Sequence, residues 1–524
     1  MVPREAVVEA GTSEIPFRHE GDKPYLMQPG MKLGIGGAPL IKSDLAKAQF
    51  TPTPSDTVHV VDTATPQQPC EPPVAVLENL DETQHAAFVR LWRRVPPHLH
   101  EIKFDYEKTL WTAADIDALG DLLCRYEHRF SHHSTDLGHV TVDPFRIVLK
   151  SDARPVKQRP YLHSPVLAAK VQTEIDKLVL AGILRRSYSN WSSPLVVIAK
   201  ADGRIRITCN YKRVNEQSVI PVMPLPTVDD LLLADLGGAH VFSTMDLVSG
   251  FFQCSIHEDS IPLTAVCTQS GNWEWTVIPM GLASRPGWFQ SIMLRVCEGL
   301  ERVRLFIDDI VCFSKTGREH VDDLRKFFER LTTFDLKLAP KKAHLGVKVV
   351  KFLGHRVTAE GLAPDPGKVE ALLKMPMPTN ISQLRSLLGA VSYYRKFLPK
   401  ITAETKSLNE LLKKGVRFEF TAEHTQIVQT LLGKLPSPHV LALPDFSAAI
   451  SGDRSFRLIT DASIDGLGAV VEQEQSDGTI RPICVLSRST LPNEKNWSAT
   501  ELECAAIVWA VKKIASCSTV YPSS

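Results

Sequence analysis

Two adjacent aspartates, Asp308 and Asp309, interrupt an otherwise apolar stretch with the sequence FIDDIV at 306–311. A tight hairpin usually turns with Asn-Gly or Asp-Gly, so two anions without a glycine have no evident advantage as a turn. Their repulsion is costly unless a cation neutralises it, and Mg²⁺ binds one or two carboxylates together with substrate phosphates. The pair is therefore typical of a magnesium site, although a solvated two-aspartate turn is the alternative for these residues alone.

A third aspartate, Asp246, ends another apolar stretch, HVFSTMDL at 240–247. Phosphoryl transfer by two metal ions needs carboxylates from separate strands that converge on ions about 3.5–4 Å apart. If the two stretches are neighbouring strands, Asp246 meets Asp308 and Asp309 at such a site. Taken alone, Asp246 could instead be an N-cap, because Leu247 and the residues after it are able to begin a helix.

Short strands and amphipathic helices alternate around these aspartates. Asp202-Gly203 is a hairpin signal between two of the strands, and Ser164 and Gly182 mark the two ends of a helix. Helices with interleaved antiparallel strands indicate an α+β fold, and no G-x-G-x-x-G or Walker A loop follows a strand. The predicted strands cover 192–200, 204–211, 240–247, 251–258, 272–279, 303–314 (with a turn inside) and 351–358, and the predicted helices cover 112–130, 164–184, 283–300 and 318–333.

Composition limits the possible function classes. The 524 residues include 60 Lys and Arg against 59 Asp and Glu, so a basic surface for nucleic acid has to be local. No apolar run approaches about 18 residues, which argues against a membrane partner. Ten scattered cysteines without a C-x-x-C pair indicate a reduced, intracellular protein. Residues 1–80 hold 11 of the 36 prolines and are predicted to be irregular or linker-like.

Several motifs follow one another in a fixed order between about residue 120 and about residue 510. They are SSPLVV (192–197), LPTVDDLL (225–232), MDLVSGFFQ (245–253), IPMGLASRP (278–286), FIDDI (306–310), FLGH (352–355) and LRSLLGAVSYYRKFLP (384–399). In this order they resemble the reverse transcriptase of gypsy-type LTR retrotransposon Pol polyproteins. The resemblance implies a right-hand polymerase with fingers, palm and thumb, then a connection region and an incomplete ribonuclease H-like α/β domain. The implied domains are a Pro-rich N-terminal region (1–110), fingers and palm (111–355), thumb and connection (356–450), and a truncated ribonuclease H-like domain (451–524).

The resemblance also assigns roles to the acidic residues of the palm. Asp246 and Asp308 match the principal ligands of the catalytic Mg²⁺ ions, and Asp309 matches a supporting carboxylate. The cofactor expected from the resemblance is therefore Mg²⁺, as it is from the residues themselves.

Five further residues match positions through which the family handles the incoming nucleotide. A guanidinium and an ammonium group suit an anionic triphosphate, which is the implied role of Arg206 and Lys200. Phe251 matches the aromatic residue that packs under the sugar and excludes a ribose 2′-hydroxyl, and Met280 matches a residue beside the base. Lys342 matches a lysine that protonates the pyrophosphate leaving group. Solvated surface charge or simple core packing is the ordinary alternative at each of these positions.

Residues from 456 onward resemble the start of the family's ribonuclease H domain. Asp461 matches its first catalytic carboxylate, and Glu503, rather than Glu501, matches the second. The third carboxylate falls beyond Ser524 in this comparison. We therefore expect an incomplete ribonuclease H site in this chain.

The implied function is RNA-directed DNA polymerisation, with an RNA template, a DNA or RNA primer and dNTPs as partners. Association with other polyprotein domains is left open, as is the choice between a cytoplasmic particle and the nucleus. The alternative is a degenerate or domesticated retroelement fragment that binds nucleic acid without catalysis. The truncated ribonuclease H part and the absence of an integrase favour this alternative, while the retained Asp246, Asp308 and Asp309 favour the polymerase. Asn210 and Phe252, where the family usually has Asp and His, suggest a diverged copy.

Overall fold

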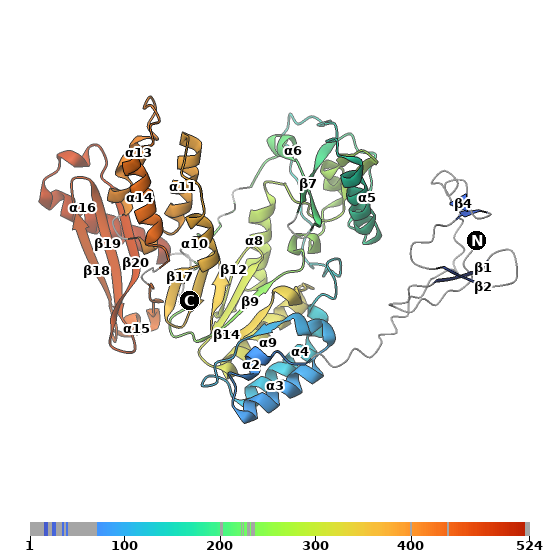
Figure 1. Cartoon of the computed structure of the whole chain (residues 1–524), viewed down its shortest axis with the longest axis horizontal. Coiled ribbons are helices and arrows are strands. Elements are labelled where there is room, and N and C mark those ends of the chain that lie inside the picture. Colours follow the sequence, from blue (N-terminus) through green and yellow to red (C-terminus); the bar gives the residue numbers. More distant parts are fainter. Residues whose placement is uncertain are drawn as a thin grey trace. The chain divides into compact units, whose positions relative to one another are not determined.

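The chain divides into two compact units, Met1–Glu71 and Pro72–Ser524. The computed structural model describes residues 15–18, 24–27, 34–35, 38–39 and 71–518, apart from 200–202, 222, 224, 228–230, 232–235, 399–400 and 437–439. In the first unit, two short antiparallel pairs are described: β1 (Ile15–Arg18) with β2 (Pro24–Met27), and β3 (Gly34–Ile35) with β4 (Ala38–Pro39) (Figure 1).

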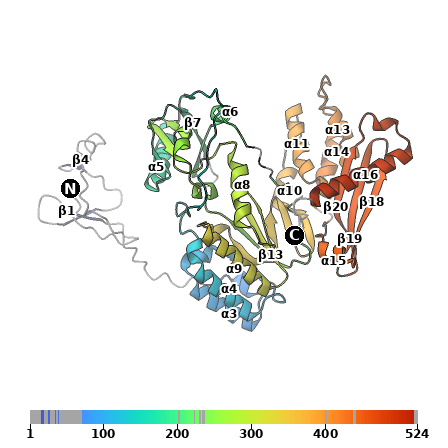
Figure 2. The ribbon, with the colours of Figure 1, turned by 180° about the vertical axis from the view of Figure 1, so that it is seen from behind.

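The palm sheet, which carries the three aspartates, has five strands in the order β12-β13-β9-β14-β5. Its core is an antiparallel set of three: β9 (Val241–Asp246), β12 (Val303–Phe306) and β13 (Asp309–Ser314). The strands predicted at 240–247 and 303–314 are therefore confirmed. Helix α9 (Gly317–Thr333) contacts β13 and β9, α4 (Ala113–Arg125) contacts α9, and α8 (Arg285–Val296) contacts β12 (Figure 2).

Residues 72–110 belong to the second unit. We had expected them to be part of the Pro-rich N-terminal region (1–110). Helix α3 (Glu82–Arg94) packs on α4, and β5 (Lys103–Phe104) extends the palm sheet beside β14 (His344–Val347). Asp81 forms a capping box that starts α3, and the helix buries an apolar face. The sequence prediction missed this amphipathic helix because it directly follows the proline-rich segment. The short helix α2 (Val74–Leu77) precedes it.

A second five-stranded sheet, the fingers sheet, has the strand order β6-β11-β10-β7-β8. The predicted hairpin is confirmed, because β7 and β8 pair antiparallel up to Ala199 and Ile205. Helix α5 begins after Ser164, whose Oγ accepts a hydrogen bond from Leu167 N–H. The elements are α5 (Pro165–Leu180), β6 (Leu184–Arg186), β7 (Ser193–Ala199), β8 (Ile205–Cys209), α6 (Lys212–Gln217), β10 (Val266–Thr268) and β11 (Gly271–Trp275).

Two strand predictions differ from the structure. The stretch 251–258 is not a strand, because Ser249 has a left-handed φ of 45° and a 3₁₀ turn, η3 (Gly250–Gln253), follows it. The stretch 351–358 is a hairpin of β15 (Val350–Phe352) and β16 (His355–Thr358). Leu353 and Gly354, with φ of 47° and 68°, make its tight turn.

The thumb and connection region has its own apolar core. Strands β15, β16 and β17 (Gly361–Pro364) form a sheet across the boundary that we expected at residue 355. The helices that follow are α10 (Pro366–Leu373), α11 (Ile381–Tyr393), α12 (Ile401–Glu404), α13 (Lys406–Glu410) and α14 (Ala422–Gly433).

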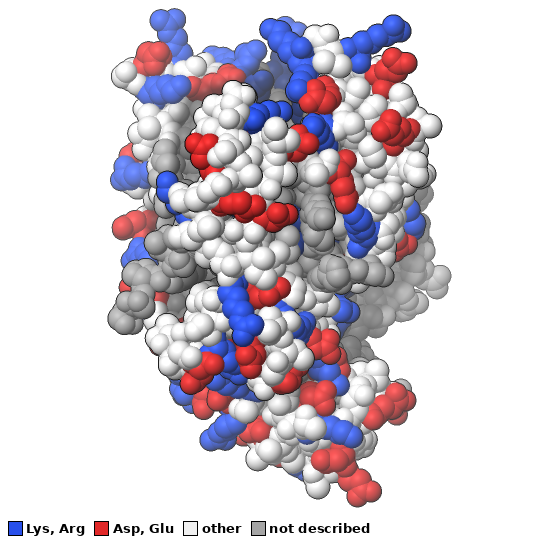
Figure 3. Space-filling view, turned by 90° about the vertical axis from the view of Figure 1, so that its left-hand side faces the viewer, with Lys and Arg blue, Asp and Glu red and all other residues white. Residues whose placement is uncertain are grey.

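The C-terminal part is a three-stranded antiparallel sheet with one long helix. It consists of α15 (Phe446–Ser451), β18 (Phe456–Ala462), β19 (Gly466–Glu474), β20 (Ile480–Ser489) and α16 (Ala499–Ser518). Acidic and basic side chains are interspersed on the face that Figure 3 shows, with broad uncharged areas between them. Among the described residues, no helix has both the length and the apolar character to span a bilayer.

A buried histidine, His320 of α9, joins the two strands that carry the aspartates. Ser314 Oγ donates to Asp323 Oδ2 (2.8 Å), so it accepts from His320 Nδ1–H (2.9 Å). His320 Nε2 then accepts from Ser243 Oγ–H (2.6 Å), and Ser243 Oγ accepts from Gly346 N–H (3.0 Å). This chain of bonds needs a neutral imidazole, and burial lowers the pKa of His320 to about 3.

Replacing His320 by Gln should make folding less sensitive to acid. An unfolded histidine titrates near pH 6.5, so the wild type loses stability as the pH falls through 6.5 towards 3. One such group contributes a slope of roughly 1.4 kcal/mol per pH unit. We expect urea unfolding of His320→Gln between pH 6 and pH 4 to show a smaller slope by about that amount.

The matched control is His85→Gln, because His85 is exposed on α3. This variant should keep the wild-type slope. If all three proteins show the same dependence on pH, His320 does not stay neutral in the folded state.

Candidate active site

The three aspartates meet at one end of the palm sheet. Asp246 ends β9, Asp309 begins β13, and the two residues are direct partners in the antiparallel register. Asp308 lies in the two-residue turn that joins β12 to β13, since Phe306 pairs with Asp309. The structure thus brings together the carboxylates that the sequence pattern singled out, with contributions from both strands.

The turn that presents Asp308 is strained. Ile307 has a φ of 58°, in the left-handed region that a β-branched residue rarely adopts. Its N–H donates to Oε1 of Gln290 (2.6 Å), a buried residue of α8. Helix α8 therefore holds the turn in a conformation that the turn sequence alone disfavours. Nothing in the sequence pattern indicated this positioning contact of Gln290.

The electrostatics of the cluster favour a cation. Loss of water and the negative charges of Asp308 and Asp246 raise the pKa of Asp309 to about 6, although its side chain still touches solvent. Burial is also the main cause that raises the pKa of Asp246. Lys342 Nζ donates to Asp246 Oδ2 (2.6 Å), while Asp246 Oδ1 is buried and has no hydrogen-bond partner.

These oxygens suit a divalent metal ion. Mg²⁺ prefers carboxylate oxygens, and the buried, unpartnered Oδ1 of Asp246 is such a donor. Within the described ranges, no group of three or more His, Cys, Asp or Glu side chains already has the geometry of a metal site. The ammonium group of Lys342 supplies the neutralising charge in this structure.

Backbone contacts hold Asp246 and Lys342 beside each other. Ala339 N–H donates to the carbonyl of Asp246 (2.9 Å), and Val248 N–H donates to that of Lys337 (3.1 Å). The buried Gln253 completes the link, because its Oε1 accepts from Lys337 N–H (2.8 Å) and its Nε2 donates to the Val248 carbonyl (2.9 Å). The chain around Asp246 and the segment that carries Lys342 are therefore one connected unit.

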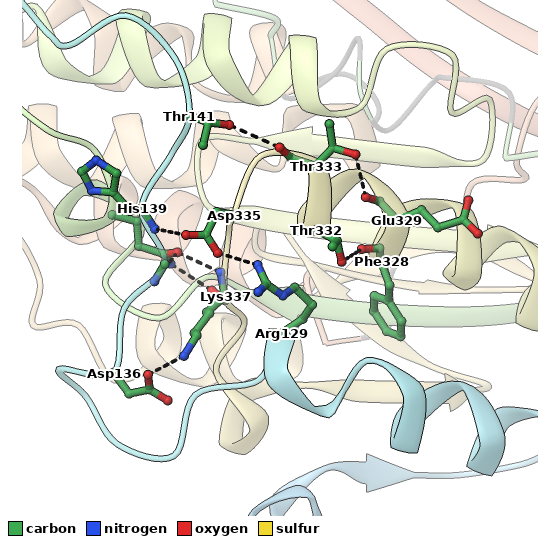
Figure 4. A network of polar contacts seen from close by, with 12 residues as sticks. Arg129, Asp136, His139, Thr141, Phe328, Glu329, Thr332, Thr333, Asp335 and Lys337 are labelled. Carbon is green, nitrogen blue, oxygen red and sulfur yellow. Dashed lines mark hydrogen bonds and ion pairs between the residues drawn. The ribbon is translucent and has the colours of Figure 1, made fainter.

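A second set of polar contacts involves Asp335 and Lys337, in the segment that leads to Lys342 (Figure 4). Asp335, with a φ of 52°, accepts from Arg129 Nη1 (2.7 Å) and from His139 N–H (3.1 Å). Lys337 forms an ion pair with Asp136. Residues far apart in the sequence thus fix the path of the segment that leads to Lys342.

The predicted nucleotide-binding residues are partly assembled. Arg206 Nε lies 3.2 Å from Met280 Sδ, so β8 and the loop before α8 bring these two together. Phe251 is half-buried in η3, and its ring centroid lies 4.5 Å from that of Phe289. Lys200 lies outside the described residues.

One residue near Phe251 was missed by the sequence reasoning. The guanidinium carbon of Arg285 lies 3.8 Å from the centre of the Phe251 ring. Its only signal in the sequence is a charged residue at the start of a predicted helix, in ASRPGWFQ at 283–290.

The second predicted acidic pair is also adjacent in space. Asp461 lies on β18, and Glu503 of α16 accepts a hydrogen bond from N–H of the next residue, Ala462 (3.3 Å). Glu501 instead caps α16, because Ser498 N–H and Oγ–H donate to it (2.7 and 2.9 Å). Asp465 forms an ion pair with Lys406 (2.7 Å). The geometry thus favours Glu503 over Glu501 as the partner of Asp461.

Two protein-family models match the chain. A model described as "Reverse transcriptase (RNA-dependent DNA polymerase)" matches residues 198–357, which include all three palm aspartates. A model described as "RNase H-like domain found in reverse transcriptase" matches residues 420–519, so it starts before the boundary that we expected at 451. The chain carries a reverse transcriptase domain and an RNase H-like domain.

Curated relatives of this chain are polyproteins of transposons. The Pol polyprotein of transposon 297 from Drosophila melanogaster is 34% identical over 366 residues, which are 68% of this chain and 33% of the relative. That of transposon opus from the same organism is 33% identical over 378 residues, 69% of this chain and 37% of the relative. The Tf2-3 polyprotein of Schizosaccharomyces pombe is 30% identical over 370 residues, which are 70% of this chain and 27% of the relative. The chain spans about a third of the length of these relatives, and the resemblance to gypsy-type Pol polyproteins is confirmed.

Solved structures share the fold. A foamy viral protease-reverse transcriptase in complex with double-stranded DNA has a TM-score of 0.70 at 22% identity, over 79% of this chain and 71% of that chain. A foamy viral protease-reverse transcriptase in complex with an RNA/DNA hybrid has a TM-score of 0.67 at 23% identity, over 79% of this chain and 55% of that chain. The predicted α+β right-hand polymerase fold with a C-terminal RNase H-like domain is confirmed. The reverse transcriptase family generally uses divalent metal ions.

Proposed function

We propose that this reverse transcriptase domain is an active RNA-directed DNA polymerase. It extends a DNA or RNA primer on an RNA template with dNTPs, and uses two Mg²⁺ ions. The observation that supports this most is the convergence of Asp246 and Asp309 as direct strand partners, with Asp308 in the adjacent turn, inside the region that the reverse transcriptase model matches. The foamy viral relatives of similar fold were solved with double-stranded DNA and with an RNA/DNA hybrid, which supports a template and primer as partners.

Asp246, Asp308 and Asp309 would hold the metal ions. When bound, these ions activate the primer 3′-hydroxyl and stabilise the charge on the reacting phosphate. The rigid register of β9 and β13 fixes the spacing of Asp246 and Asp309. Lys342 Nζ lies 2.6 Å from Asp246 Oδ2, and its ammonium group would donate a proton to the departing pyrophosphate.

The remaining residues would select the nucleotide. Arg206 and Lys200 are the proposed contacts for the triphosphate, and Met280, beside Arg206, is the proposed contact for the base. The half-buried ring of Phe251 would meet a ribose 2′-hydroxyl and so favour deoxynucleotides. Because Phe251 packs on Phe289, the ring cannot move away without disturbing α8.

The alternative, binding of nucleic acid without catalysis, draws no support from the palm. Asn210 Nδ2 donates to the Tyr161 hydroxyl (3.0 Å), and Phe252 packs on Trp275 with ring centroids 5.4 Å apart. Both departures from the family pattern are therefore accommodated by local contacts. Neither replaces one of the three aspartates.

Changing Asp308 to Asn should abolish primer extension without unfolding the protein. Loss of one metal ligand removes several kcal/mol of transition-state stabilisation, and about 4 kcal/mol corresponds to a thousandfold lower rate. The measurement is single-turnover extension of a primer on an RNA template with Mg²⁺, together with thermal unfolding. The control is Asp322→Asn, which removes an exposed carboxylate of α9 and should leave the rate unchanged. Near-normal extension by Asp308→Asn would falsify the metal site.

Changing Phe251 to Val should weaken discrimination against ribonucleotides. Without the ring, a 2′-hydroxyl no longer meets a side chain, so the ratio of dNTP to rNTP incorporation should fall at least about tenfold, which is about 1.4 kcal/mol. Phe252→Val is the matched control, because this neighbour packs on Trp275 instead. The same ratio in wild type and Phe251→Val would mean that Phe251 serves only as core.

This chain should cleave little or no RNA in an RNA–DNA hybrid, even if it polymerises DNA. Two carboxylates, Asp461 and Glu503, are adjacent, whereas Glu501 and Asp465 are engaged elsewhere. Two Mg²⁺ ions need more negative charge than this pair supplies. The test is a hybrid-cleavage assay on the polymerisation-competent protein. Cleavage that disappears in Asp461→Asn would contradict the prediction and show that another carboxylate completes the site.

A further inference from the structure

Arg285 carries a charge that is incompletely hydrogen-bonded near the proposed nucleotide site. It is the first residue of α8, and its guanidinium group lies over the ring of Phe251 at 3.8 Å. Attraction between the cation and the ring fixes the position of both side chains. Gln290, five residues further along the same helix, holds the turn that presents Asp308. Helix α8 therefore places Arg285 beside Phe251, the proposed contact for the sugar, and carries the residue that holds the turn of Asp308.

The guanidinium of Arg285 has unused donors. Its Nε and Nη1 are both buried, and neither has a hydrogen-bond partner in the part of the chain that the structure describes. Arg330 shows how the same fold satisfies a guanidinium, because its Nε and Nη2 donate to the carbonyls of Val296 and Arg295. Buried donors without partners destabilise a protein. These two nitrogens of Arg285 can thus donate to an acceptor that enters with a ligand.

The surrounding charges indicate that this ligand is an anion. Burial and the positive charge of Arg206 lower the pKa of Arg285 to about 10, while Asp308 opposes the shift. Arg285 therefore stays charged at neutral pH and repels Arg206. Two neighbouring guanidinium groups are stabilised together when one polyanion lies between them, and guanidinium groups bind phosphate oxygens through paired N–H donors.

We propose that Arg285 is a second guanidinium of the nucleotide site, which binds the triphosphate of the incoming nucleotide together with Arg206. This inference rests on the proposed polymerase function. Because Arg285 also stacks on Phe251, one side chain connects the triphosphate to the ring that meets the sugar. Triphosphate binding and sugar selection are then coupled through a direct contact.

The first test measures equilibrium binding of inorganic tripolyphosphate to the full chain by calorimetry, without primer or template. We expect wild type to bind it and Arg285→Met to bind it at least about tenfold more weakly, with Arg285→Lys between the two because it keeps the charge but not the paired donors. Arg295→Met, which removes an exposed arginine at the other end of α8, should bind like wild type. Thermal unfolding checks that each variant is folded.

The second test separates KM from kcat in primer extension. Arg285→Met should raise the KM for dNTPs about tenfold or more, leave the affinity for the primer–template duplex unchanged, and reduce the preference for dNTPs over rNTPs. Arg285→Lys should restore part of the KM. Together, these results support a role in triphosphate binding that loss of packing alone does not produce.

Three outcomes would overturn the inference. They are no measurable binding of tripolyphosphate by wild type, equal binding by wild type and Arg285→Met, and weaker binding of the duplex in place of a higher KM. A protein that binds tripolyphosphate through Arg285 but extends no primer supports the anion site and contradicts only the proposed polymerase activity. The calorimetric measurement therefore distinguishes failure of the inference from failure of the proposed function.

Discussion

Asp246 and Asp309 face each other across two neighbouring antiparallel strands, and the rest of the palm has to support this like-charge pair. Opposed like charges destabilise a strand pair, so the register of β9 and β13 must be held by other contacts. The buried residues behind the aspartates, Met245 and Ile310, supply apolar packing. His320 bonds to both strands from α9, and Lys342 neutralises one of the carboxylates. A stiff support of this kind keeps carboxylates close enough to share metal ions.

Several unfavourable features of the fold lie around this pair. Ile307 adopts a left-handed φ, Asp246 has a buried oxygen without a partner, and Arg285 has two buried nitrogens without partners. Other such features lie elsewhere in the described residues, for example the left-handed φ of Leu353 and the buried Nε1 of Trp111 without a partner. Strain and unsatisfied polar groups persist where the surrounding structure enforces them, and they gather at functional sites. What distinguishes the palm from those other positions is the convergence of carboxylates from two neighbouring strands.

The sequence was informative wherever a local pattern has one physical solution. The hairpin at Gly203 and the helix that begins after Ser164 follow from turn and capping chemistry, and the pair Asp308-Asp309 between apolar residues pointed to the site. It failed where distant residues decide the local conformation. The strand predicted at 251–258 is a 3₁₀ turn, because Gln253 bonds to the segment near residue 337. Arg285 and Gln290 look like ordinary helix residues until Phe251 and Ile307 are seen beside them.

The two acidic sites differ in how the fold supports them. Asp309 begins β13, which has a partner strand on each side, so neighbours on both sides fix its position. Asp461 lies on β18, an edge strand of the described three-stranded sheet, whose one strand partner is β19 and which α16 and α15 also contact. Metal-dependent phosphoryl transfer depends on ligands held in a fixed arrangement, and an edge strand with one partner restrains its residues less. The strands beside β13 therefore hold the palm carboxylates in place. The acidic pair Asp461 and Glu503 depends on further contacts to the edge of β18. On this physical ground, polymerisation and hybrid cleavage are separable properties of the chain.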